Sequence, residues 1–151
     1  MQSYSFPHHL SNSDILRNHQ LVENARSVIS SQLELDLEED GSLTGFYAGF
    51  FLAVSFSDLH PLMVVTLSRP FTLRADINTY RALNRTNLSN ILGSHIINND
   101  VGCYSFRATQ WLFSAMTGAE FRLFLSRCQY DAEKGYANTL PSYIHQSGGP
   151  S

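Results

Sequence analysis

The long apolar run from Leu43 to Phe56 constrains the fold more than any other feature of the sequence. It follows the tripeptide Glu39-Asp40-Gly41, and an Asp-Gly pair is a strong signal for a tight hairpin turn. Before the turn, three leucines alternate with acidic residues over 33–38, which is the pattern of a strand with one face in water. The sequence therefore predicts two antiparallel strands joined at Asp40-Gly41, the second of them running through the whole apolar run.

The remaining elements complete a mixed α+β pattern. Apolar residues at helical spacing predict helices over about 14–31, from a cap at Asp76 to about residue 93, and from Thr117 to about residue 138. Further strands are expected over 62–69, over 95–97 and over 101–112. The order α-β-β-β-α-β-β-α with tight turns predicts a two-layer α+β domain, with a mainly antiparallel sheet and helices on one face.

The 151 residues suffice for one domain, and 43% hydrophobic content allows a buried core. We expect that domain over 13–138. The polar segment 1–12 is predicted to be a flexible N-terminal arm, and 139–151, rich in Ser, Gly and Pro, a flexible C-terminal tail.

Charge and hydropathy exclude several partners. The net charge is −3 and Lys134 is the only lysine, whereas a nucleic-acid binder shows a basic stripe. The longest apolar stretch, Phe46–Phe56, spans eleven residues, and a membrane-spanning helix needs about 20. The N-terminus has neither basic residues nor an apolar segment of signal-peptide type. We therefore predict a cytoplasmic protein that binds neither nucleic acid nor membrane.

No catalytic, cofactor or metal site is predicted. Cys103 and Cys128 are interpreted as free thiols and small buried hydrophobes. The acidic group Glu38-Glu39-Asp40 is interpreted as a solvated hairpin tip, and no nucleophile motif or phosphate-binding glycine loop is present. The histidines lack zinc-site spacing and are interpreted as surface or turn residues; they are His8, His9, His19, His60, His95 and His145.

The element order resembles that of the YbjN family and of the class I type III secretion chaperones, which share one fold. The resemblance covers about residues 14–138. The motifs that carry it are the acidic hairpin Glu38–Gly41 before the apolar run, the predicted helical segment Tyr80–Asn87, the segment Arg107-Ala108-Thr109, and a closing helix that starts at a threonine. The resemblance implies a small cytoplasmic protein-binding module, often a homodimer, without cofactor or catalysis.

The apolar run has two faces in a strand. One register is expected to form the core and consists of Thr44, Phe46, Ala48, Phe50, Leu52, Val54 and Phe56. The other register, from Leu43 through Tyr47 and Phe51 to Ser55, is also apolar, although the open face of a two-layer domain is usually polar. An apolar patch facing water marks an interface. The predicted partner-binding residues are Tyr47, Phe51, Leu62, Val64 and Arg107.

Three alternatives stay open for this face. The first helix or the N-terminal arm covers it, or a bulge near Phe50-Phe51 exchanges the two registers. Arg107 pairs with Glu34 or Asp36, or it contacts backbone carbonyls of a partner.

The predicted function is non-catalytic protein binding, chaperone- or adaptor-like, in which this sheet face docks a second copy or an extended peptide. The first alternative is a small regulatory or ligand-binding domain with a cleft between the second helix and the sheet. The second alternative is an enzyme of unknown type.

Overall fold

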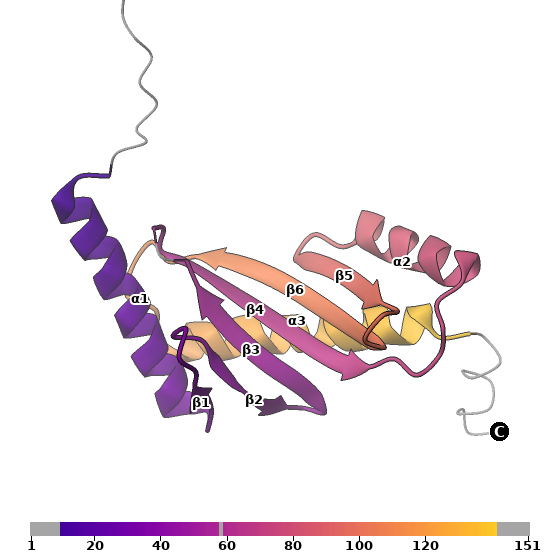
Figure 1. Cartoon of the computed structure of the whole chain (residues 1–151). Coiled ribbons are helices and arrows are strands. Elements are labelled where there is room, and N and C mark those ends of the chain that lie inside the picture. Colours follow the sequence, from indigo (N-terminus) through magenta and orange to yellow (C-terminus); the bar gives the residue numbers. More distant parts are fainter. Residues whose placement is uncertain (1–9, 58, 142–151) are drawn as a thin grey trace, which may run out of the picture.

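The computed structural model describes residues 10–57 and 59–141 (Figure 1). In this part of the chain, three helices accompany one sheet of six antiparallel strands in the spatial order β1-β2-β3-β4-β6-β5. In chain order, the elements are α1 (Asn12–Gln32), β1 (Asp36–Leu37), β2 (Leu43–Tyr47), β3 (Phe50–Phe56), β4 (Leu62–Pro70), α2 (Ile77–Ser89), β5 (Gly93–Asn98), β6 (Cys103–Trp111) and α3 (Gly118–Thr139). The predicted α+β class is confirmed.

Side-chain caps fix where the helices begin. The Thr117 hydroxyl accepts the N–H of Glu120 at 3.1 Å, as predicted from the sequence. Asp76 accepts the N–H of Thr79 at 3.0 Å, and the Thr79 hydroxyl accepts the N–H of Asp76 in return. These bonds satisfy amide groups that have no partner inside a helix. The three helices therefore start within two residues of their predicted positions.

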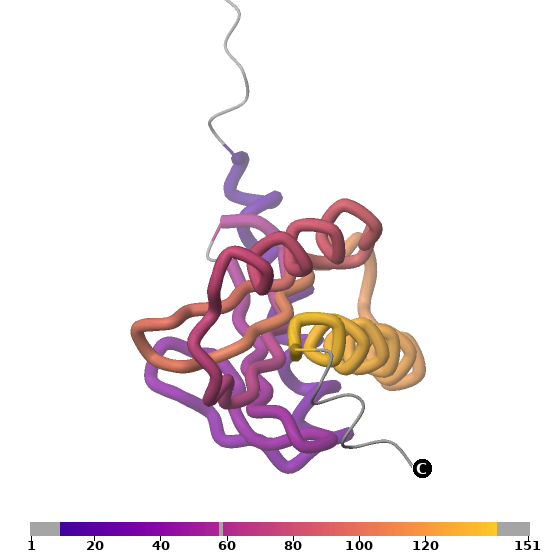
Figure 2. Tube along the Cα trace, turned by 90° about the vertical axis from the view of Figure 1, so that its right-hand side faces the viewer, coloured from indigo at the N-terminus to yellow at the C-terminus, as the bar shows by residue number. Residues whose placement is uncertain are grey.

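The core lies between one face of the sheet and the helices. Figure 2, turned by 90°, shows α3 along one side of the sheet. The fully buried strand residues on that side are Leu43, Phe50, Leu52, Val54, Met63, Val65, Leu67, Tyr104 and Phe106. Helix α3 adds Phe121, Leu125 and Cys128, and α1 adds Ala25 and Ile29. Burial of this apolar surface is the main force that stabilises the two layers.

The prediction of one continuous strand from Leu43 to Phe56 is wrong, because a two-residue hairpin turn divides it. Ala48 and Gly49 have φ values of 51° and 83°, as a type I′ turn requires at both central positions. Tyr47 lies directly opposite Phe50, so these two side chains point to the same face of the sheet.

The turn exchanges the two registers in β2. Leu43 is buried, and Phe46, expected in the core, is 81% exposed. The prediction that Tyr47 shares the face of Phe51 is wrong for the same reason, since Tyr47 packs against the core. The register exchange considered from the sequence does occur, although a turn causes it rather than a bulge.

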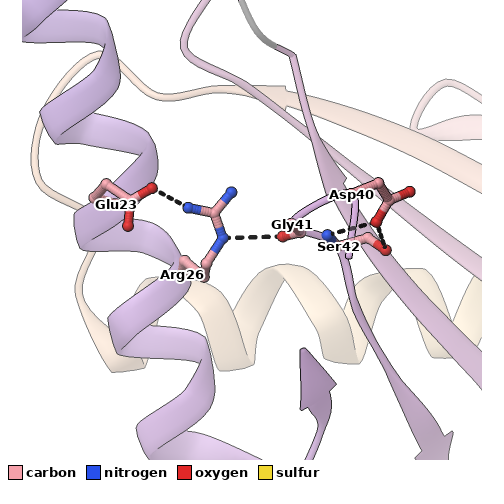
Figure 3. A network of polar contacts seen from close by, with 5 residues as sticks. All are labelled: Glu23, Arg26, Asp40, Gly41 and Ser42. Atoms are coloured by element: carbon pink, nitrogen blue, oxygen red, sulfur yellow. Dashed lines mark hydrogen bonds and ion pairs between the residues drawn. The ribbon is translucent and has the colours of Figure 1, made fainter. Parts of the chain in front are cut away.

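A polar network fixes α1 against the turn between β1 and β2 (Figure 3). Arg26 of α1 donates from Nε to the Gly41 carbonyl at 2.9 Å and forms an ion pair with Glu23. In the turn, the Asp40 carboxylate accepts the Ser42 hydroxyl at 2.6 Å and the Ser42 N–H at 2.9 Å. These hydrogen bonds hold the pKa of Asp40 below its usual value. The acidic hairpin tip is thus exposed, as predicted, but structurally ordered by its own bonds.

Candidate partner-binding surface

In the described segments, one face of the sheet carries no helix, and we call it the open face. Because side chains alternate along a strand, the residues next to the buried ones form this face. They are Thr44 and Phe46 of β2; Phe51, Ala53 and Ser55 of β3; Leu62, Val64, Thr66 and Ser68 of β4; Cys103, Ser105, Arg107, Thr109 and Trp111 of β6; and Ser94, Ile96 and Asn98 of β5. In Figure 1 this face lies toward the viewer, with α3 behind the sheet.

Aromatic side chains occupy two separated regions of the open face. Phe46 and Phe51 are direct cross-strand partners, with ring centroids 5.7 Å apart in an edge-to-face arrangement. At the other end of the strands Trp111, 48% exposed, lies opposite Leu62 and 5.8 Å from the His60 ring. Exposed aromatic side chains of this kind are the usual anchors of protein interfaces.

The middle of the open face is polar. The hydroxyls of Ser68 and Ser105 lie 2.9 Å apart, and Arg107 stands between Thr66 and Ser94 in the strand register. The predicted pairing of Arg107 with Glu34 or Asp36 is wrong, because β6 lies four strand positions from β1, about 19 Å at the usual strand spacing. Within the described segments the single ion pair joins Arg26 to Glu23. Arg107 thus has no ion-pair partner among the described residues.

Four of the five predicted partner-binding residues share the open face: Phe51, Leu62, Val64 and Arg107. Tyr47 does not, for the reason given above. Phe46, Ile96 and Trp111 were not predicted as binding residues from the sequence, although they are 81%, 44% and 48% exposed. Two features of the sequence pointed to Phe46 and Trp111. Gly49 permits a turn inside the apolar run, which changes the face of Phe46. Trp111 lies an even number of residues from Arg107 in the same predicted strand, so the two side chains share a face.

Helix α1 does not cover the open face. Its buried residues Val22, Ala25 and Ile29 belong to the core on the opposite side of the sheet, and the helix contacts α3. The alternative that the first helix shields this face is therefore wrong. The alternative that the N-terminal arm does so concerns residues 1–9, which lie outside the described part.

A second apolar surface lies on α2. The predicted apolar stripe of this helix exists, but none of its residues is buried. Ile77 is 64% exposed, Leu88 is 80% exposed, and Ile91, just after the helix, is fully exposed. The helix thus contributes no fully buried side chain, although Leu83 packs partly buried against the core.

A cleft of about 590 Å³ lies between α2 and the end of α3. Its floor includes Phe71 and Leu73, and Arg74, Arg85 and Asn138 supply polar groups. Its size falls in the range of small-molecule sites. It lies near the position that the sequence analysis gave to a ligand cleft, although α3 rather than the sheet forms its second wall.

The two cysteines and His95 differ in how deeply they are buried. No group of three or more His, Cys, Asp or Glu side chains in the described segments is placed to hold a metal ion. Cys128 is fully buried, which raises the pKa of its thiol to about 12. Cys103 is only partly buried and lies on the open face. The interpretation of His95 as a surface or turn residue is wrong, since the residue lies in β5 and is 2% exposed.

Among the helices described, none is both long enough and apolar enough to cross a membrane.

Two solved structures share this fold. The type III secretion chaperone SycH of Yersinia pestis, solved in complex with a stable fragment of YscM2, aligns with a TM-score of 0.53 and 12% identity over 78% of this chain and 98% of its own. A chain of the HopA1–SchA chaperone–effector complex aligns with a TM-score of 0.50 and 13% identity over 83% of this chain and 99% of its own. No family model and no curated protein matches the sequence. The fold is thus that of type III secretion chaperones, and the likeness to YbjN stays a prediction.

Proposed function

We propose that this chain is a non-catalytic, cytoplasmic binding protein, chaperone- or adaptor-like, that holds an extended segment of a partner protein on its open face. The observation that carries the proposal is the uncovered sheet face with two exposed aromatic regions. Its structural neighbours support it, since SycH was solved with a YscM2 fragment and SchA with HopA1. The arrangement of the described titratable groups supports binding rather than catalysis.

The two aromatic regions give the surface a defined chemistry. An extended segment that crosses the strands buries one apolar side chain beside Phe46 and Phe51 and another beside Trp111. Between them, Arg107 and the serine hydroxyls bind polar or acidic groups. Apolar anchors around a polar centre give affinity through burial and orientation through hydrogen bonds.

The two edges of the sheet differ in whether a strand of a partner protein can pair with them. At the β5 edge, the Asn87 side-chain amide accepts the N–H of His95 at 2.7 Å and donates to its carbonyl at 3.0 Å, which blocks strand addition there. At the other edge, β1 pairs with only Leu43 and Thr44 of β2, so 45–47 pair with β3 on one side and with no strand of the described residues on the other. A partner segment that leaves the open face is therefore able to add to β2 as a strand.

The test is capture of a partner by three forms of the protein: the native form, Phe51→Asp and Leu123→Asp. Leu123 is 55% exposed on α3, on the side of the molecule away from the open face, and it provides the matched control. We expect native protein and the Leu123 variant to retain one partner that Phe51→Asp loses, with all three folded by circular dichroism. Equal retention by the Phe51 variant contradicts the proposed surface.

We propose further that the protein forms a homodimer through α2. The support is the exposure of Ile77 and Leu88 on one face of α2 and of Ile91 just after the helix, since exposed apolar side chains that gather on one surface mark interfaces. Sedimentation equilibrium is expected to give the dimer mass for the native protein and the monomer mass for Leu88→Asp. A monomeric native protein over the micromolar range refutes this part.

A second candidate function, binding of a small anionic ligand, rests on the cleft, where the guanidinium groups of Arg74 and Arg85 outnumber the single carboxylate of Asp76. Guanidinium groups favour carboxylate and phosphate oxygens. A thermal-shift screen of anionic metabolites measures it, since a ligand that binds only the folded state raises Tm. A rise in Tm that disappears with Arg85→Ala supports the ligand-binding function. No rise with any compound removes it.

A further inference from the structure

His95 is a buried titratable side chain, 2% exposed, that the proposed partner binding leaves unused. It lies in β5, and its ring packs 5.0 Å from the Phe106 ring centroid and 6.0 Å from that of Tyr104. From the other layer α3 approaches so closely that a Cβ atom at Gly135 would overlap the Nδ1 atom of His95. Both ring nitrogens are in hydrogen bonds, with Tyr104 and with Asn90.

A chain of hydrogen bonds fixes which nitrogen carries the proton. The N–H of Leu92 donates to the Asn90 side-chain oxygen at 3.0 Å, so the Asn90 amide nitrogen faces His95. That nitrogen is 2.5 Å from Nε2 and is a donor, which makes Nε2 the acceptor. The ring proton therefore lies on Nδ1 and is donated to the Tyr104 oxygen at 2.5 Å. Tyr104 in turn donates its own proton to the Ala132 carbonyl at 3.0 Å.

A second proton on the ring breaks this chain. It must enter at Nε2, where it meets the donor nitrogen of Asn90. If the Asn90 amide turns over to offer its oxygen, its nitrogen then faces the N–H of Leu92, which is also a donor. Every orientation of Asn90 thus leaves two donors in contact when His95 is positively charged.

The charged groups around the His95 ring offset the unfavourable effect of its protonation only in part. Burial lowers the pKa of His95, and Asp131 of α3 acts in the opposite direction. Burial raises the pKa of Tyr104 in β6, which keeps its hydroxyl neutral. The positive charge of Arg69 in β4 lowers that pKa, but the effect of burial is larger. The contacts from α2 and its following loop, Asn87 and Asn90, are uncharged. The neutral ring is therefore the form that the fold stabilises.

His95 is also where the end of α2 is attached. Asn87 forms two hydrogen bonds with the backbone of His95, and Asn90 forms one with its ring. Leu83 of α2 packs partly buried against the core, and these polar bonds join the end of the helix to β5. Loss of the Asn90 bond weakens the junction at the same residue that Asn87 holds.

We propose that His95 is a proton-operated switch at the junction of α2 and β5, which holds the end of α2 while neutral and releases it when protonated. The inference stands on the hydrogen-bond chain and does not depend on the proposed partner. The sign follows from linkage. Because the pKa of His95 is lower in the folded protein than its ordinary value of 6.5, its stabilising contribution is complete above that pH. It is lost as the pH falls from 6.5 through the folded pKa.

The first test uses the native protein. Nitrogen NMR of the His95 ring is expected to show the Nδ1–H tautomer at pH 7.5. Hydrogen exchange of the amides of 87–95, corrected for intrinsic rate, is expected to accelerate at least tenfold at the pH where the ring titrates. The core amides of β3 and β4 are expected to stay protected at that pH. An Nε2–H tautomer, or titration of the ring with unchanged exchange over 87–95, overturns the proposal.

The second test uses a variant in which protonation of His95 is expected to strengthen the junction of α2 and β5. Asn90→Asp keeps an acceptor for Leu92 and places a second carboxylate oxygen at Nε2, where it accepts from the protonated ring. In this variant we expect the His95 titration to move upward by at least one pH unit and exchange over 87–95 to fall on mild acidification. His60→Gln is the matched control, since His60 lies on an exposed turn. The same pH response in Asn90→Asp as in the native protein overturns the proposal.

Discussion

At the scale of single residues, Gly135 is the position where the smallest change is expected to have a large effect. A glycine-to-alanine substitution inside a helix ordinarily stabilises a protein by up to about 1 kcal/mol. At Gly135 the added methyl group overlaps His95 and contacts the Tyr104 hydroxyl. We therefore expect Gly135→Ala to destabilise the fold by about 1–3 kcal/mol. Urea denaturation measures it, and an unchanged or raised midpoint refutes the described packing of α3 on β5.

The neighbouring residues Phe50 and Phe51 test the assignment of the two faces. Phe50 is fully buried and Phe51 is 44% exposed. We expect Phe50→Ala to cost about 3–5 kcal/mol of unfolding free energy, and Phe51→Ala less than about 1 kcal/mol. The same denaturation experiment reports both. Equal losses mean that the open face is covered in solution.

At the scale of elements, the turn between β2 and β3 is strained. Ala48 has a positive φ of 51°, a conformation that costs a non-glycine residue about 1 kcal/mol and that asparagine tolerates better. We expect Ala48→Asn to stabilise the fold by about 1 kcal/mol and to raise Tm by roughly 2–4 °C. Thermal denaturation checks it. A lower Tm shows that Ala48 is favoured there for another reason.

The same turn explains where sequence reasoning failed. An apolar run without Asn-Gly or Asp-Gly inside it reads as one strand, and Ala48-Gly49 is a weak turn signal. One missed turn moved Phe46 and Tyr47 to the wrong faces, because a strand alternates its faces at every residue. The helices were easier to predict, since Asp76 and Thr117 mark their starts through hydrogen bonds that depend only on local sequence.

The helical spacing of the apolar residues in α2 was predicted correctly, but their exposure to water was not. Periodicity shows that Ile77 and Leu88 share one face of the helix. It does not show whether that face meets the core or water, which depends on where β5 and α3 lie. His95 was misjudged for the same reason, since its neighbours Tyr104 and Gly135 come from other elements.

At the scale of the whole molecule, the two layers formed by residues 10–57 and 59–141 leave one side of a six-stranded sheet without a helix over it. The secretion chaperones with which this chain shares its fold are solved with protein partners, and the proposed function assigns the partner of this chain to the open face. The class of fold was predictable from element order alone. The residues of the surface were predictable only after the strand register was known.

The measurement that most directly tests the open face as the binding surface is site-specific photo-crosslinking in the producing cells. A benzophenone side chain replaces Phe51 in one variant and Leu123 in the other, and both side chains are about half exposed. The account predicts a crosslink to another protein from position 51, at a yield at least several-fold above that from position 123. Crosslinks of equal yield from both positions, or from position 123 alone, contradict it.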